Sequence, residues 1–228
     1  MDEIISRLYA MQDAQYRAFN AGLVPLGGDK KMIGVRTPEL RRLARELSGT
    51  PQAAALMAAA PHEYFELDQL HAFLIAEMRD FDACLDALEE FLPHVDNWAT
   101  CDQLNPRVLG RHKAALLPRI RAWLASGRCY TVRFAIGQLM RWYLDADFSE
   151  EYLDMVCAVK SEEYYVRMMI AWYFATALAK QYDAALPYIA AGRLDTWTHN
   201  KAIQKARESL RVPQAHKDAL SALKIKNA

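Results

Sequence analysis

Apolar residues recur every three to four positions along most of the chain, as in LHAFLIAEM (70–78), CLDALEEFL (84–92) and RFAIGQLMRWYL (133–144). This spacing places the apolar side chains on one face of a helix. The two-residue alternation of a half-buried strand is not found in the sequence. The pattern therefore predicts an all-α protein whose neighbouring helices are joined by short connections.

Proline and glycine mark the expected helix boundaries. Thr37-Pro38 precedes ELRRLAREL, which predicts Thr37 as the N-cap and Pro38 in the first turn. Gly49-Thr50-Pro51 then ends that helix. Further upstream, AGLVPLGGDKK (21–31) reads as a loop without an aromatic residue, which joins a single first helix to Met32.

An internal repeat is visible in the second half of the chain. YTVRFAIGQLM begins at Tyr130, YYVRMMIAWYF at Tyr164 and the degenerate THNKAIQKAR at Thr198, so that Arg133, Arg167 and Lys201 are spaced 34 residues apart. A period of this length, with two helices in each unit, is typical of an α-solenoid, in which equivalent positions form a stripe along one face. Cations are also common near helix starts, so a chance coincidence is the alternative.

The chain has 228 residues, of which 53% are hydrophobic, and we expect residues 1–228 to form a single domain. The acidic start MDEIISRLYA does not resemble a signal peptide, and the longest apolar run, MMIAWYFATALA (168–179), is too short to span a bilayer. The four cysteines stand singly, with no spacing that suits zinc. These features predict a cytoplasmic protein that carries no metal.

The net charge of zero conceals an asymmetry between the two halves. Residues 1–102 contain nine Lys/Arg and 17 Asp/Glu, whereas residues 103–228 contain 19 and 11. The segment Gln103–Leu144 has eight cations and no acidic residue. A one-sign segment of this kind attracts a polyanion, although the solvated faces of ordinary helices produce similar runs.

The stretch HVDNWATCDQL (94–104) holds the strongest candidates for chemistry. Trp98 and Asp102 are four residues apart and therefore share one face of a helix. Such a pair can be a buried helix-stabilising carboxylate beside a core indole, or a site that stabilises a developing cation against an apolar wall. We interpret the neighbouring Asp96 and Asn97 as N-cap residues and Cys101 as core. Trp123 and Trp142 are also interpreted as core, as is Trp197, for which a place at the edge of a DNA groove is the alternative.

The segments NWATCDQL, YTVRFAIGQLM, YYVRMMIAWYFATALAK and NKAIQKARESLRV, preceded by IGVRTPELRRLAREL, resemble the bacterial DNA alkylation repair proteins built from HEAT-like repeats, the AlkD-like family. The resemblance covers most of the chain from about Ile33. It implies a right-handed, C-shaped α-solenoid (an α-α superhelix) with a basic concave face that grips duplex DNA. It also implies excision of cationic alkylpurines such as 7-methylguanine and 3-methyladenine without base flipping.

The resemblance also implies roles for individual residues. The family's site combines an Asp, an Arg and two Trp, which correspond here to Asp102, Arg133, Trp98 and Trp172. Asp102 would stabilise the cationic sugar and position water, and the two indoles would face the deoxyribose. Phosphate contacts are expected from four cations: Arg133, Arg167, Lys201 and Lys205. Of these, Arg167 and Lys201 are expected from the 34-residue repeat alone and not from the resemblance.

Such an enzyme would need neither a metal nor an organic cofactor, and would bind duplex DNA as a monomer. The best-characterised glycosylases of this family have an extra aromatic-containing helix before the G-[IV]-x-T-P segment, so the loop 21–31 predicts a reduced wall beside the lesion. A non-catalytic protein that binds distorted or branched DNA is the first alternative. A solenoid that binds an acidic protein partner is the second.

Overall fold

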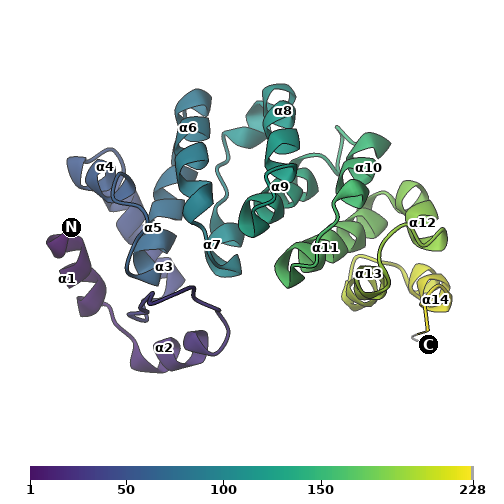
Figure 1. Ribbon diagram of the computed structural model, residues 1–228, viewed down its shortest axis with the longest axis horizontal. Helices are drawn as coiled ribbons and strands as arrows, with labels where there is room; N and C mark the ends of the chain where they lie inside the picture. The colour runs from purple at the N-terminus through teal and green to yellow at the C-terminus, as the bar shows by residue number, and fades with distance from the viewer. Residues whose placement is uncertain (227–228) are drawn as a thin grey trace. The chain divides into compact units, whose positions relative to one another are not determined.

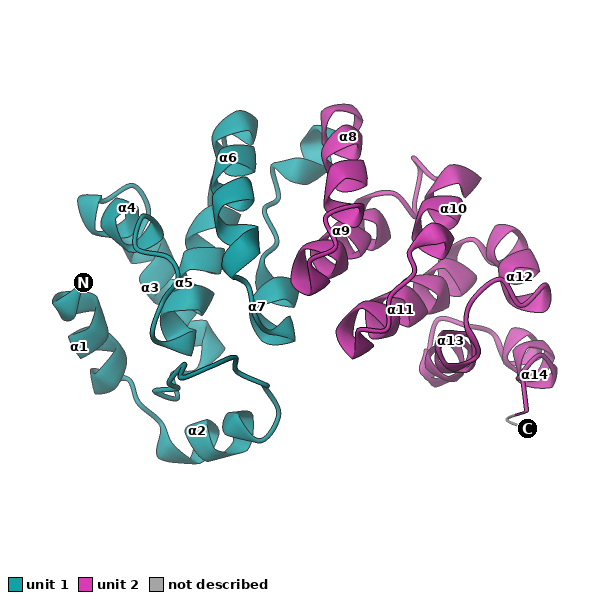
Figure 2. Cartoon of the chain, viewed as in Figure 1, with its two compact units in different colours: residues 1–113 teal, residues 114–228 magenta. Residues whose placement is uncertain are grey.

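The computed structural model describes residues 1–226 and is all-α, as predicted, with fourteen α-helices and no β-strand in that range (Figure 1). Its contacts divide the chain into two compact units, residues 1–113 and 114–228 (Figure 2). The prediction of a single domain stays a prediction. Among the described residues, no helix combines the length and the apolar character needed to cross a bilayer.

The first unit holds seven α-helices and two short 3-10 turns. The helices are α1 (Asp2–Ala10), α2 (Ala14–Ala21), α3 (Thr37–Leu47), α4 (Pro51–Met57), α5 (Phe65–Ala76), α6 (Phe81–Phe91) and α7 (Trp98–Gln103), and the turns are Leu92–His94 and Leu109–Arg111. The pairing of α3 with α5 forms the main core, in which Leu40, Leu43, Leu70 and Phe73 are buried. Burial of their apolar surface is the main force that holds the two helices together.

The N-terminal segment departs from the sequence prediction. Two helices, α1 and α2, precede the loop where a single helix was expected, because Asp13 caps a new helix by accepting the Tyr16 amide at 2.9 Å. Phe19 lies on α2 and is 66% exposed. The expectation that this region lacks an aromatic-bearing helix after the first one was therefore wrong, and the missed signal was Asp13, a residue typical of N-caps.

A buried carboxylate fixes the chain between α2 and α3. Glu66 of α5 is 1% exposed and accepts the backbone amides of Ile33, Gly34 and Val35 at 2.9, 2.7 and 3.3 Å. Gly34 has a φ of +97°, and a Cβ there would lie 2.4 Å from the Cβ of Arg17, so only glycine fits. This contact anchors the loop that precedes it, residues 22–32, to α5.

The boundary of α3 also differs by one residue from the prediction. Thr37 is the first helical residue and Arg36 is the N-cap, which makes no side-chain capping bond, while the Thr37 hydroxyl faces that of Tyr16 at 3.5 Å. The predicted end is confirmed, since α3 stops at Leu47 and Gly49 takes a φ of +78°. Thr50 then caps α4.

The described part of the second unit, residues 114–226, contains seven helices, the first of which begins one residue earlier: α8 (Lys113–Leu124), α9 (Cys129–Trp142), α10 (Glu150–Ala158), α11 (Tyr164–Lys180), α12 (Tyr182–Ala190), α13 (Thr196–Glu208) and α14 (Gln214–Ala222). The long and mostly buried α11 packs against both α9 and α13. The three repeat motifs fall near the starts of these three helices, with α10 and α12 between them. Two helices per repeat, as predicted, are therefore confirmed for this unit.

Candidate functional site

The helix α7 carries both Trp98 and Asp102 in the first unit. Asn97 is its N-cap, as predicted, and its side-chain oxygen accepts the Thr100 amide at 2.8 Å. Trp98 and Asp102 are both half-buried, one helical turn apart. A helix of six residues does not hold its own conformation in water, so contacts with the rest of the unit must fix it.

A hydrogen-bonded chain of amide side chains ties α7 to its neighbours. The Gln69 side chain of α5 is 1% exposed and donates to the Thr100 hydroxyl at 2.8 Å. The Gln103 side chain donates to the side-chain oxygen of Gln69 at 2.9 Å. Its own side-chain oxygen accepts from the Arg41 guanidinium of α3 at 3.2 Å. Because buried hydrogen bonds are directional, this network restricts the rotation of α7 about its axis.

The loop 22–32 packs against the other side of this helix. The Trp98 indole N–H donates to the Leu23 carbonyl at 3.2 Å, and the ring lies against an apolar cluster that includes Val24, Phe65 and Ala99. The loop that reads as featureless in the sequence therefore positions the indole. Leu23 is itself 51% exposed, so the loop also presents apolar surface beside α7.

Lys30 fastens the same loop through two ion pairs. Its ammonium contacts Asp68 of α5 and lies 2.7 Å from Asp96, next to the N-cap of α7. Burial raises the pKa of Asp68 to about 7, although the Lys30 ammonium opposes the shift. Asp96, predicted as an N-cap residue, instead pairs with Lys30. Its carboxylate also accepts a hydrogen bond from the side-chain NH2 of Asn97 at 2.9 Å.

These contacts hold α7, the helix on which Trp98 and Asp102 lie one turn apart. A carboxylate held near an aromatic wall stabilises positive charge that develops in a reaction, at no cost of reorganisation. Cys101 is 2% exposed and so is a core residue, as predicted. The signals for Lys30 and Gln69 were missed, because no local pattern distinguishes a lysine in a glycine-containing loop, or a glutamine in an apolar helix, from an ordinary surface residue.

The other predicted site residues belong to the second unit, and Arg133 is the most buried of them. It lies on α9, is 4% exposed, and donates to the Tyr165 carbonyl of α11 at 2.7 Å. This hydrogen bond ties α9 to the first turn of α11. The phosphate contact predicted for Arg133 stays a prediction.

Arg167 and Lys201 lie in one groove with Trp197. The Arg167 guanidinium is 5.0 Å and the Lys201 ammonium 5.7 Å from the centre of the Trp197 ring, within the range of cation–π attraction. The repeat thus brings two equivalent cations to one place. Trp197, predicted as core, is only half-buried and lines this groove, so that prediction was wrong.

Trp172 and Lys205 share a separate depression of about 230 Å³, which also includes Arg211 and Glu208. The Trp172 indole is 41% exposed, an unusual position for so large an apolar ring. Of the remaining tryptophans, Trp123 is a core residue, as predicted, and Trp142 is only partly buried and donates to Gln138 at 3.0 Å.

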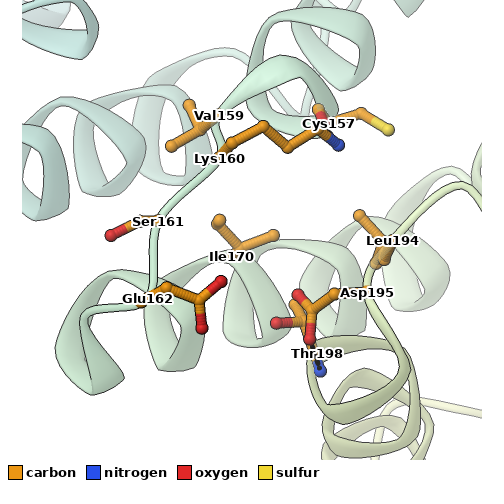
Figure 3. A pocket seen from close by; sticks show the side chains of 9 residues that line it. All are labelled: Cys157, Val159, Lys160, Ser161, Glu162, Ile170, Leu194, Asp195 and Thr198. Carbon is orange, nitrogen blue, oxygen red and sulfur yellow. Dashed lines mark hydrogen bonds between the residues drawn. The ribbon is translucent and has the colours of Figure 1, made fainter.

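A smaller cavity shares Asp195 with the groove and is also lined by Glu162 of the loop before α11, by Ile170 of α11 and by Thr198 of α13 (Figure 3). Its volume of about 80 Å³ is well below that of typical organic ligand sites. Arg167 and Asp195 form an ion pair at the rim of the groove. Although burial opposes the shift, hydrogen bonds from Thr198 and Arg167 hold the pKa of Asp195 below its usual value.

Within residues 1–226, His, Cys, Asp and Glu side chains form no cluster of three that could hold a metal ion. The fold and these sites define an all-helical protein with Trp98 and Asp102 on one anchored helix of the first unit and cation-lined aromatic grooves in the second. The chain belongs to the family of DNA alkylation repair enzymes, whose family model matches residues 4–228. No curated protein matches the chain.

Proposed function

We propose that the protein is a DNA glycosylase that excises cationic alkylpurines, such as 7-methylguanine and 3-methyladenine, from duplex DNA. Membership in the DNA alkylation repair family supports a role in DNA repair. The observation that carries the proposal is the anchoring of α7, whose Trp98 and Asp102 are held by the Gln69 network, the Asn97 cap and the loop 22–32.

The chemistry requires little beyond a well-placed negative charge. An alkylated purine is already cationic, so when its bond to C1′ breaks, the bonding electron pair neutralises the base and the sugar becomes an oxocarbenium-like cation. Water then adds to C1′ and releases a proton. Asp102 stabilises the sugar cation and orients the water, while Trp98 and Trp172 supply aromatic faces that favour positive charge and exclude solvent.

Binding of the substrate rests on the cations of the second unit. Arg167, Lys201 and Lys205 contact DNA phosphates and so orient the duplex without reading its sequence. Arg133, which would contact a phosphate, is the fourth member of the proposed catalytic set, after Asp102, Trp98 and Trp172. The pairing of α11 with α9 and α13 supports a stack of HEAT-like helical repeats. We propose in addition that the solenoid is right-handed, that the protein acts as a monomer and that it leaves the base unflipped.

The test is release of 7-methylguanine from methylated duplex DNA by the wild type and by Asp102→Asn. We expect the variant to bind DNA and to release the base more slowly, by on the order of a hundredfold or more, because the substitution keeps the shape and removes the charge. Equal release rates for the two proteins would remove Asp102 from the mechanism.

A second function is non-catalytic binding of distorted or branched DNA. The groove of Arg167, Trp197 and Lys201 supports it, because cations beside an aromatic ring can bind DNA without catalysing a reaction. DNA binding by the wild type without any base release would support this function over the first.

A further inference from the structure

The groove of the second unit combines positive charge with open volume. It encloses about 570 Å³, which is in the range of sites that hold small organic molecules. Three cations and one carboxylate line it: Arg167, Lys201, Lys224 and Asp195. The lining therefore favours an anionic ligand.

Lys224 reaches this groove because the chain after α14 is pinned to α13. Asn200 donates to the Ile225 carbonyl at 2.9 Å and accepts the Ile225 amide at 3.0 Å. His199 makes a further hydrogen bond of 2.8 Å to the Leu223 carbonyl. The third cation is thus held at the rim of the groove by its neighbours on both sides.

Aromatic rings continue from the groove along the starts of the helices. Tyr164, at the start of α11, meets Trp197 edge to face at a centroid distance of 5.6 Å and meets Tyr165 at 5.1 Å. Tyr165 in turn lies 5.7 Å from Tyr130 at the start of α9. Tyr164 as a whole residue is 54% exposed, so it is accessible to a ligand from solvent despite these two ring contacts.

A nucleotide carries both features that this surface matches, an anionic phosphate and a flat aromatic base. In a duplex, neighbouring base pairs cover both faces of each base, so an exposed tyrosine ring can stack only on a base that has lost a neighbour. Proteins that bind single strands combine a basic groove with aromatic stacking in the same way.

We propose that the groove of Arg167, Trp197, Lys201 and Lys224 binds an unpaired nucleotide of a DNA strand, with its base stacked on Tyr164. The proposal deepens the DNA binding proposed above and does not depend on excision. It assigns to the protein a preference for duplexes that carry a single-stranded segment, such as a gap, a flap or a frayed end.

The experiment compares three DNA molecules: a blunt duplex, the same duplex with a short single-stranded extension, and one whose extension is an abasic sugar-phosphate chain. The abasic extension has the same phosphates and no bases. We expect the base-bearing extension to raise the affinity of the wild type by about tenfold over the abasic one, since stacking is sequence-tolerant but requires a base.

Tyr164→Ala should abolish this gain, and Tyr164→Phe, which keeps the ring, should retain it. Both variants should bind the blunt duplex as the wild type does, because the groove cations remain. Equal affinities for the base-bearing and abasic extensions, or a gain that survives in Tyr164→Ala, would overturn the proposal.

The blunt duplex separates this proposal from the function proposed above. Binding of the blunt duplex without a gain from the extension overturns only the stacking proposal. If no DNA is bound at low salt, both the stacking and the duplex-binding proposals fail.

Discussion

Asp68 shows how burial changes the chemistry of one carboxyl group. Its side chain is 2% exposed, and its pKa is raised to about 7 in the folded protein, against roughly 4 in an unfolded chain. Between these values the folded state holds a proton that the unfolded state has lost. The stability contributed by this group is therefore present below about pH 4 and is lost as the pH rises through 7.

We predict that Asp68→Asn removes the loss of stability that the Asp68 carboxyl causes as the pH rises. Lys30 keeps its ion pair with Asp96, so the variant should still fold. The free energy of unfolding of the variant minus that of the wild type should increase between pH 4 and 7, by roughly 1 kcal/mol per pH unit. Denaturant unfolding at several pH values measures this difference.

The buried His62–His71 pair also makes stability depend on pH, because burial lowers the pKa values of the two histidines to about 4 and 3. Subtracting the wild-type free energy of unfolding from that of the variant removes this contribution. These histidines stabilise the protein above their unfolded pKa and lose that effect as the pH falls, but both proteins contain them. The exposed Asp86→Asn, which makes the same chemical change on the surface of α6, serves as the matched control.

At the scale of the elements, α7 depends on its anchors more than on its own sequence. We predict that Gln69→Leu lowers the free energy of unfolding by about 1–3 kcal/mol, because the Thr100 hydroxyl and the Gln103 amide lose their buried partner. Base release should fall as well, since α7 would no longer be held in one orientation. Denaturant unfolding and an excision assay on the same preparation give both values.

Gln52→Leu is the control for this substitution, since Gln52 is exposed on α4. It should change the free energy of unfolding by less than about 0.5 kcal/mol and leave excision unchanged. If Gln69→Leu behaves like this control, the amide network does not position α7.

The elements themselves were largely predictable from sequence, because helical periodicity is a local property. The repeat located the starts of α9, α11 and α13, and the NWATCDQL segment gave both α7 and its Asn97 cap. Residues that act through distant partners were not predictable. Lys30 meets Asp68 across 38 positions, and Trp197 becomes part of a groove only when α11 and α13 pack together.

At the scale of the whole molecule, binding of duplex DNA should depend steeply on salt if the cations of the second unit contact phosphates. We predict that Lys201→Ala weakens binding for all sequences and makes the slope of log affinity against log salt shallower by about one. Equilibrium titrations at a series of salt concentrations measure the slope. An unchanged slope would exclude Lys201 as a phosphate contact.

The same titration decides the role of Arg133. If its guanidinium contacts a phosphate, Arg133→Ala should also make the slope shallower. If the bond to the Tyr165 carbonyl is its only role, the variant should lose stability and keep the slope.

The pinned chain after α14 has a practical consequence for any recombinant version of this protein. Removing residues 223–226 would take away the backbone partners of His199 and Asn200 and the Lys224 ammonium at once. A truncation intended only to shorten the terminus would therefore alter the proposed nucleotide groove. A purification handle or fluorescent label attached at this end would lie next to Lys224, so affinities should be measured before and after its removal.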